Sequence, residues 1–453
     1  MQSWFEKIID LLYENARNYM RNAKLKINYL VKKTSVKNGL WMYYLQIFNT
    51  IVPLLTLPYI TRILGTAGYG EFSIAINIIG YLQVVVEYGF GMSATRKVAL
   101  SSKSKDEINK IYSGVLLSRL LLLALCFLFL IGYLIAHIRS TEQYLSLAIL
   151  FISLFGSSVQ QNWLFQGMQE MKYISIVNII SRIISVILIF TTVKSQDDLL
   201  LYCFLYAVST FLSGFLGLLF AKIKYKIHFV KTDFADVIAE LKKGWHVFTT
   251  QLSSKVFGSI GITFLGMFSI DSTTVGIYSA IQKIPSIMVL AWVPISQIMY
   301  PISSKKMQSS FLDGKHFIYR LRRLFLPLFS LVAILIAVFS KRVVTIAFGT
   351  EYAEYYYWII PLLLWLIVSI NNNFWGIQIL LGSGHDKEYS RCFQLGIVYT
   401  IIFNLSLIYF FGGLGASLAP LFSECILGFA LRIEIRKIEI RSVQNGVEPS
   451  STL

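Results

Sequence analysis

The stretch between residues 38 and 97 constrains the fold more than any other part of the chain. It holds two apolar runs, at about 38–61 and 72–92, and each is long enough to cross a bilayer as an α-helix, which takes about 20 residues. A short glycine-containing turn separates the runs, and Arg62 is the one basic residue close to it. Because Lys and Arg are enriched in cytoplasmic loops, the basic residues beyond both outer ends predict a transmembrane hairpin that starts and finishes in the cytoplasm.

The same pattern continues to the end of the chain. Ten further apolar runs bring the total to twelve, at about 111–136, 143–165, 173–193, 199–221, 244–270, 275–301, 324–340, 355–381, 391–411 and 414–434. Strands of a membrane barrel alternate over about 10 residues and do not give unbroken runs of this length. Only 14% of the residues are charged, against about 25% in soluble proteins. The sequence therefore predicts an all-α polytopic membrane protein with about 12 transmembrane helices.

The distribution of basic residues supports this topology. Of the 41 Lys and Arg residues, 32 fall on the side assigned to the cytoplasm, 5 on the opposite side and 4 inside the runs. Both termini are therefore predicted to be cytoplasmic. The same bias explains the formal net charge of +17, which in a soluble protein would suggest nucleic acid, so we expect no nucleic-acid partner.

The longest cytoplasmic connection divides the chain into two halves of six runs. Gly70-Glu71-Phe72-Ser73 opens the second run of the first half, and Gly276-Ile277-Tyr278-Ser279 opens the second run of the second half. A parallel repeat of this kind places the repeat axis along the membrane normal, as in some transporters. The predicted segments are an N-terminal extension (1–37), a first half (38–222), a linker (223–243), a second half (244–435) and a tail (436–453).

The N-terminal extension has its own pattern. Trp4, Ile8 and Leu12 recur at helical spacing, and residues 1–37 contain eight Lys and Arg residues. We predict an amphipathic helix. It lies either on the anionic surface of the cytoplasmic leaflet or against loops of the protein itself.

Four basic residues lie inside the apolar runs, namely Arg119, Arg182, Lys255 and Lys283. Arg182 comes ten residues after Lys172, which is about 15 Å into a hydrocarbon core about 30 Å thick. A charged side chain that faces lipid at that depth costs about 2.5–3.5 kcal/mol, so all four are expected to face a wet cavity inside the protein. They predict a substrate site for an anion, and a phosphate or pyrophosphate suits both guanidinium and ammonium groups.

Polar side chains form stripes at helical spacing on several runs. Those predicted to line the cavity are Gln46, Asn49, Gln160, Gln161, Asn178, Gln251 and Gln282. Small and hydroxyl residues on the same stripes also fit helix–helix packing, so the isolated cations are the stronger signal. The acids inside the runs are Glu87 and Glu424. Each is a candidate for ion coupling or for an ion pair with one of the cations.

The sequence does not predict an enzyme, a metal site or a cofactor. It contains no GxxxxGK[ST] nucleotide-binding motif, no CxxC among its four cysteines and no HExxH among its five histidines. The connections opposite the cytoplasm are short and carry no nucleophile–base pair. Nothing in the pattern indicates an oligomer, so we expect a monomer.

Three motifs in order resemble the polysaccharide (O-antigen repeat-unit) flippase family, part of the multidrug/oligosaccharidyl-lipid/polysaccharide exporter superfamily. They are Leu57-Pro58-Tyr59-Ile60-Thr61-Arg62-Ile63-Leu64-Gly65 with Gly68-Tyr69-Gly70 and Tyr88-Gly89-Phe90-Gly91, then Gln161-Asn162-Trp163-Leu164-Phe165-Gln166-Gly167, and then Val275-Gly276-Ile277-Tyr278-Ser279-Ala280. The likeness covers about residues 38–435. The chain departs from the family in its N-terminal extension and at residues 258–266, which lack the acid that in the family often precedes the pair corresponding to Leu265-Gly266.

The resemblance implies two six-helix lobes that form a V around a central cationic cavity. It also implies a flippase that moves undecaprenyl-pyrophosphate-linked oligosaccharides across the bacterial inner membrane by alternating access, for surface polysaccharide such as lipopolysaccharide. The implied partners are this lipid-linked oligosaccharide and membrane lipids, with polysaccharide assembly proteins as candidates. Two alternatives stay open. A cation-coupled drug exporter of the same superfamily would need membrane-embedded acids, and a membrane glycan polymerase would need catalytic groups in larger external loops.

Overall fold

The computed structural model describes residues 34–101, 104–137, 141–268 and 271–444, and every element assigned in these ranges is helical. The elements are α2 (Thr34–Glu87), α3 (Phe90–Leu100), α4 (Lys105–His137), α5 (Thr141–Val159), α6 (Asn162–Gly167), α7 (Met171–Thr192), η1 (Gln196–Asp198), α8 (Leu199–Tyr225), α9 (Phe234–Phe268), α10 (Thr273–Ile281), α11 (Lys283–Ser309), α12 (Phe311–Val338), α13 (Ser340–Phe348), η2 (Thr350–Trp358), α14 (Ile359–Asn373), the π-helix η3 (Phe374–Leu381) and α15 (Asp386–Gln444). The predicted amphipathic helix within residues 1–37 lies outside the described residues, apart from the last four positions, which begin α2.

Nine helical segments of the described chain are long and apolar enough to cross a membrane. Two of them, Lys37–Leu100 and Asp386–Ile440, have 64 and 55 residues, far more than the roughly 20 that one crossing needs. Each is bent at a glycine with positive φ, Gly65 at 66° and Gly412 at 55°, and each bend falls between two predicted apolar runs. Helix α9 contains the predicted run 244–270 up to Phe268, the last residue described there, but it is not among the nine. The protein is thus a helical multi-pass membrane protein, and the total of 12 spans stays a prediction.

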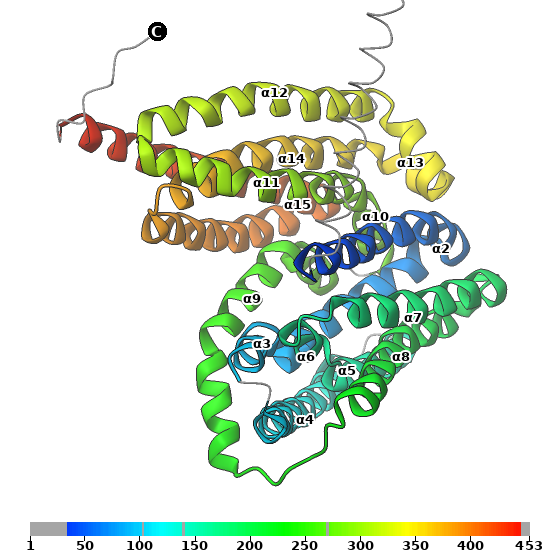
Figure 1. Cartoon of the computed structure of the whole chain (residues 1–453). Helices are drawn as coiled ribbons and strands as arrows, with labels where there is room; N and C mark the ends of the chain where they lie inside the picture. Colours follow the sequence, from blue (N-terminus) through cyan, green and yellow to red (C-terminus); the bar gives the residue numbers. More distant parts are fainter. Residues whose placement is uncertain (1–33, 102–103, 138–140, 269–270, 445–453) are drawn as a thin grey trace, which may run out of the picture.

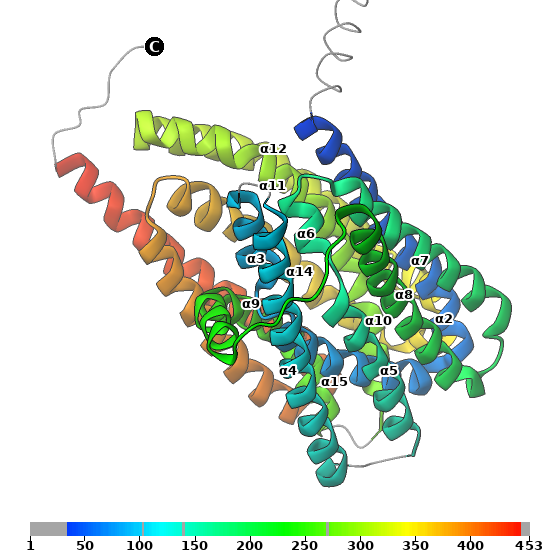
Figure 2. The same ribbon diagram turned by 60° about the horizontal axis from the view of Figure 1, so that its bottom comes forward.

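The helices form two groups, as both ribbon views show (Figures 1 and 2). Helices α2 to α8 lie together, helices α11 to α15 lie together, and α9 and α10 lie between the groups. One apolar cluster joins the two groups and contains Ile79 of α2, Ile277 of α10 and Leu362 of α14, all essentially inaccessible to solvent. The two groups therefore share a packed contact at this level of the molecule.

Where helices α2 and α10 cross, a glycine of each helix packs against the backbone of the other. A Cβ on Gly70 would lie 1.9 Å from the carbonyl oxygen of Ser272, and a Cβ on Gly276 would lie 2.0 Å from the carbonyl oxygen of Thr66. Each glycine therefore meets the residue four positions before the other glycine, which is the pattern of contacts that a two-fold axis produces. The two glycines also occupy matching positions in the repeat of Gly70–Ser73 and Gly276–Ser279, so the contact relates equivalent parts of the two halves.

Candidate functional site

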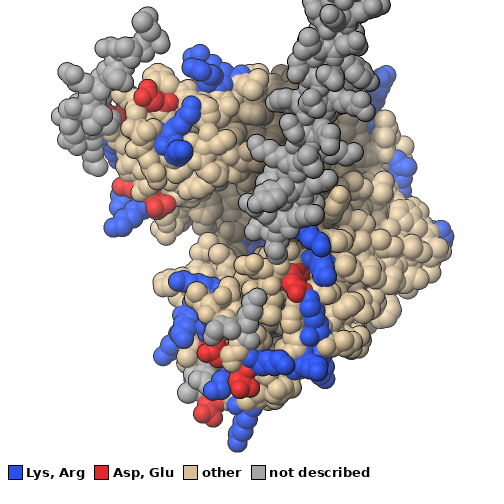
Figure 3. Space-filling model, in the orientation of Figure 1, with Lys and Arg blue, Asp and Glu red and all other residues tan. Residues whose placement is uncertain are grey.

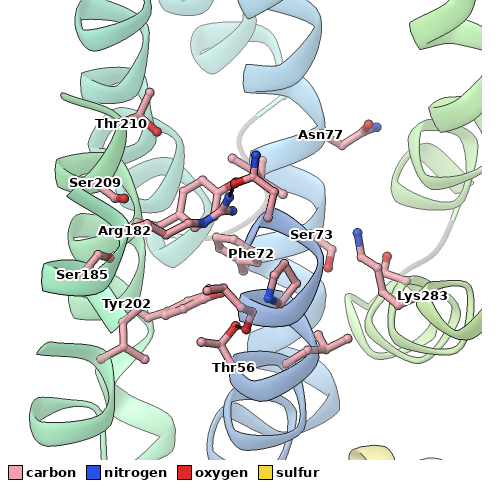
Figure 4. Close-up of a pocket in the computed structure, with 18 of the residues that line it drawn as sticks. Thr56, Phe72, Ser73, Asn77, Arg182, Ser185, Tyr202, Ser209, Thr210 and Lys283 are labelled. Atoms are coloured by element: carbon pink, nitrogen blue, oxygen red, sulfur yellow. Dashed lines mark hydrogen bonds between the residues drawn. The ribbon is translucent and has the colours of Figure 1, made fainter. Parts of the chain in front are cut away.

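A cavity of about 580 Å³ lies where the two helix groups meet. Its wall comes from α2, α7 and α8 on one side and from α9, α10 and α11 on the other, together with Gln160 from the break between α5 and α6. Figure 4 shows part of this wall, with Phe72 and Ser73 of α2 between the side chains of α7 and those of α11. Ser73 and Ser279, which occupy matching positions in the two repeats, both line the cavity.

Three of the four predicted cations line this cavity, namely Arg182 of α7, Lys255 of α9 and Lys283 of α11. Figure 4 shows Arg182 and Lys283 on opposite sides of it. The Nη1 atom of Arg182 donates a hydrogen bond to Oδ1 of Asn49 at 2.7 Å. Among the described residues that line the cavity, none is Asp or Glu. The wall therefore carries three positive charges and no negative one.

Local packing explains how Lys255 reaches the cavity. Its Nζ occupies the space beside Gly80, where a Cβ would lie only 2.7 Å away, and it lies 5.4 Å from the centre of the Tyr81 ring. Tyr81 and Gly80 belong to α2, so Lys255 extends from α9 across to the other helix group. A ring face attracts an ammonium group through its negative quadrupole. This contact stabilises a cation that forms no salt bridge with an acid in the described ranges of the chain.

The structure brings the predicted polar residues together only in part. Asn49, Asn178, Gln160 and Gln282 line the cavity, and the amide of Gln160 donates to Oγ of Ser213 at 3.2 Å. The remaining three predicted residues, Gln46, Gln161 and Gln251, do not line it. Gln161 is buried instead, and its amide donates to the carbonyl oxygen of Val159 at 2.8 Å.

Arg119 and the two acids lie away from the cavity wall. Arg119 is buried and donates to the carbonyl oxygen of Gln160 at 2.8 Å. Glu87 accepts a hydrogen bond from the amide of Gln83 at 2.8 Å, and Glu424 accepts one from Asn372 at 2.6 Å. In the described part of the chain neither carboxylate forms a salt bridge. Their coupling roles stay predictions.

Sequence reasoning did not identify the aromatic part of the wall. Tyr69, Phe72, Tyr202 and Tyr206 all line the cavity, and the Phe72 ring packs 4.7 Å from the Tyr202 ring and 5.4 Å from the Tyr206 ring, centre to centre. Asn77 was also missed, and it donates to the hydroxyl of Thr263 across the two groups at 2.9 Å. The i, i+4 pair of Ser73 and Asn77 is the signal that could have identified this face of the second run.

Contacts between the two groups close the molecule at the end where α2 bends. The Tyr352 hydroxyl donates to the carbonyl oxygen of Gly65 at 3.2 Å, and the Thr66 amide donates to the Glu351 carboxylate at 3.3 Å. Arg62 also donates to the carbonyl oxygen of Ile346. At the other end, which carries α3 and the C-terminal end of α15, the space-filling view shows a hollow between the groups (Figure 3).

Residues 35–307 match the family described as polysaccharide biosynthesis protein. The chain belongs to this family. The matched stretch begins in α2, ends in α11 and includes every residue that lines the cavity. The family resemblance read from the sequence motifs is thereby confirmed.

Two curated relatives of this family member match over nearly their whole length. Both are named "Putative O-antigen transporter". The protein from Shigella dysenteriae is 26% identical over 401 residues, which cover 86% of this chain and 97% of the relative. The protein from Escherichia coli (strain K12) is 25% identical over 409 residues, which cover 88% of this chain and 96% of the relative.

Solved structures with a similar fold are transporters. The structure titled "Lipid II flippase MurJ, inward closed conformation" aligns with a TM-score of 0.67 at 14% identity and covers 88% of this chain and 87% of that one. An inward-facing multidrug resistance MATE family transporter of the MOP superfamily aligns with a TM-score of 0.61 at 13% identity, over 87% of this chain and 99% of that one. At these identities the likeness establishes the fold alone.

Proposed function

We propose that this protein is a flippase that translocates undecaprenyl-pyrophosphate-linked oligosaccharide repeat units across the bacterial inner membrane for surface polysaccharide synthesis. It is a transporter and not an enzyme, in keeping with the names of its relatives and the transporter fold. The observation that carries the proposal is the cavity shared by the two helix groups, whose described wall holds Arg182, Lys255 and Lys283 and no acid.

The chemistry of the wall fits the two polar parts of such a cargo, the diphosphate and the sugar. A diphosphate diester carries negative charge on both phosphates, and charge-assisted hydrogen bonds from guanidinium and ammonium groups are about twice as strong as neutral ones. Arg182 approaches from one group, Lys283 from the other and Lys255 from α9, which lies between them. Amides and hydroxyls such as Gln160, Asn178 and Ser209 line the same space, and they match the hydroxyl groups of a sugar.

We further propose an orientation in which both termini lie in the cytoplasm. Residues 38–222 and 244–435 then form two lobes of six helices each, arranged as a V and joined by residues 223–243. In this orientation the hollow of Figure 3 faces the cytoplasm, and the contacts around Gly65 close the periplasmic end. The conformation is the one that would accept cargo from the cytoplasmic leaflet, and transport would follow by alternating access.

A cation-coupled drug exporter is the alternative that shares this fold, since a MATE transporter aligns well. Its cargo would meet three like charges in this cavity. Two unit charges 4 Å apart repel by about 4 kcal/mol at an effective dielectric constant of 20. The absence of acids from the described wall therefore favours an anionic cargo over a cationic drug.

A genetic experiment tests the proposal. In a strain that lacks the gene, surface polysaccharide should be lost and lipid-linked repeat units should accumulate in the cytoplasmic leaflet, and the wild-type gene should restore the polymer. Lys255→Gln should restore it poorly, whereas Lys305→Gln, which alters an exposed lysine away from the cavity wall, should restore it fully. Normal polymer in the deletion strain would contradict the proposal.

A further inference from the structure

Arg119 has surroundings that differ from those of the cavity cations. Only 5% of its surface is exposed, and its Nη1 atom donates to the carbonyl oxygen of Gln160 at 2.8 Å and to that of Ser157 at 3.4 Å. The guanidinium carbon also lies 5.9 Å from the centre of the Phe90 ring. The guanidinium group is therefore directed at the backbone of another helix and at a ring, and not into the cavity.

The backbone that Arg119 contacts is the end of a helix. Helix α5 ends at Val159 and α6 begins at Asn162, so Gln160 lies in the break between them. The last carbonyl oxygens of a helix have no partner within the helix, and they form the negative end of the helix dipole. A buried cation with several N–H donors satisfies two of these oxygens and balances the dipole. The Ser157 oxygen also accepts the Gln160 backbone N–H at 3.3 Å, so Arg119 adds a charged donor at a break where unpaired backbone groups are costly within the membrane.

The same break places Gln160 in the cavity wall. Its amide nitrogen lies 3.2 Å from Oγ of Ser213 and 3.5 Å from Oδ1 of Asn178, and Ser213 in turn donates to Asn178 at 3.0 Å. Gln160, Asn178 and Ser213 all line the cavity. Arg119 therefore holds the backbone of Gln160, and the side chain of Gln160 belongs to a polar network that faces the cavity.

We propose that Arg119 is a positioning residue. It fixes the break between α5 and α6, and through that backbone it sets the Gln160 amide, with Asn178 and Ser213, in the wall of the cavity. It does not bind cargo itself. The role of the network in transport rests on the proposed function, but the role of Arg119 in holding position 160 does not.

The first test measures the position of residue 160 without any cargo. In full-length protein in inverted membrane vesicles, Gln160→Cys is reacted with a membrane-impermeant methanethiosulfonate. The background is Cys425→Ser, because the other three cysteines are buried. Arg119→Gln removes the charged donor that holds the backbone of residue 160, and it should change the labelling rate of the cysteine about tenfold relative to the parent protein. Arg119→Lys keeps the charge and should bring the rate back toward the parent value. An unchanged rate in both variants would overturn the proposal.

The second test separates positioning from direct binding of cargo. A double-mutant cycle compares Arg119→Gln, Gln160→Ala and the double variant for restoration of surface polysaccharide, at matched protein levels in the membrane. If Arg119 acts through Gln160, the double variant should lose no more activity than the worse single variant. Losses that multiply would mean that Arg119 contacts cargo independently, which contradicts the proposal. Failure of the wild-type gene to restore polymer would contradict the proposed function, and the labelling result would still decide the role of Arg119.

Discussion

Gly276→Ala should force open the end of the molecule that is closed in this structure. The new Cβ would lie 2.0 Å from the carbonyl oxygen of Thr66, whereas a favourable non-bonded contact needs about 3.5 Å. Helix α10 must therefore move away from α2 by roughly 1.5 Å. Because no rotamer change can relieve a clash between a Cβ and the backbone, the strain acts on the contact between the two helix groups.

The contacts at risk are the hydrogen bonds beside that crossing. They join Glu351 to Thr66, Tyr352 to Gly65 and Arg62 to Ile346. Glu351 and Arg62 are exposed, so the hydrogen bond that each forms stabilises the closed state by only about 1 kcal/mol. The hydrogen bond of Tyr352 contributes about 1 kcal/mol more. Loss of two or three of them should shift the balance between closed and open states by about 2–3 kcal/mol, which is roughly 30- to 150-fold.

Accessibility of a cavity residue from the outside measures this shift. A cysteine replaces Ser286, which lines the cavity on α11, and spheroplasts are treated with a membrane-impermeant thiol reagent. Gly276→Ala should increase external labelling at least tenfold. Gly258→Ala is the matched control, because Gly258 also lines the cavity but a Cβ there meets nothing within 4 Å. Labelling of Gly276→Ala at the wild-type rate would refute the reasoning.

Three further predictions follow from the same structure. If Lys283, which lines the cavity, contacts a phosphate of the proposed cargo, Lys283→Gln removes one charge-assisted hydrogen bond and should lower the initial rate of cargo transport into vesicles about tenfold or more. A wild-type rate would show that this lysine does not bind cargo. Glu424→Gln should leave the thermal midpoint of the detergent-solubilised protein unchanged or higher, because the Asn372 and Ser369 partners are neutral. Glu424→Leu removes the side-chain acceptor of both, although the Asn372 amide keeps its bond to the backbone carbonyl oxygen of residue 424, and it should destabilise by about 1–3 kcal/mol. Gly214→Val should lower the midpoint sharply, since a Cβ there lies 2.1 Å from the carbonyl oxygen of Gly156; Gly132→Val, with nothing within 4 Å, should not.

The helices and the three cations of the cavity could be predicted because the bilayer imposes simple rules. A crossing helix needs about 20 apolar residues. Most of each predicted run is helical in the structure, although runs such as 143–165 and 275–301 are each divided between two helices. An isolated cation inside such a run must avoid lipid, and Arg182, Lys255 and Lys283 do so by lining one cavity. The glycine repeat was also informative, because Gly70 and Gly276 meet each other's helices.

The rest could not be predicted because it depends on how helices pack. Arg119 satisfies the same rule as the other cations, but its partner is the broken end of α5, which the uninterrupted apolar run 143–165 does not reveal. Nor do Phe72 and Tyr202 differ in sequence from lipid-facing aromatic residues, although both line the cavity. At Gly65 and Gly412 the backbone leaves the helical conformation for one residue, and two helices meet there without a loop between them. Such bends make the number of spans hard to count from the lengths of helices alone.

Direct observation of lipid transfer tests the central claim most closely. Purified protein is reconstituted into liposomes that carry a fluorescent undecaprenyl-pyrophosphate oligosaccharide, and movement between leaflets is followed with a membrane-impermeant quencher. The account predicts transfer well above that in protein-free liposomes, and its loss when Arg182, Lys255 and Lys283 are all replaced by Gln. Transfer no faster than in protein-free liposomes, together with movement of a cationic drug by the same preparation, would contradict it.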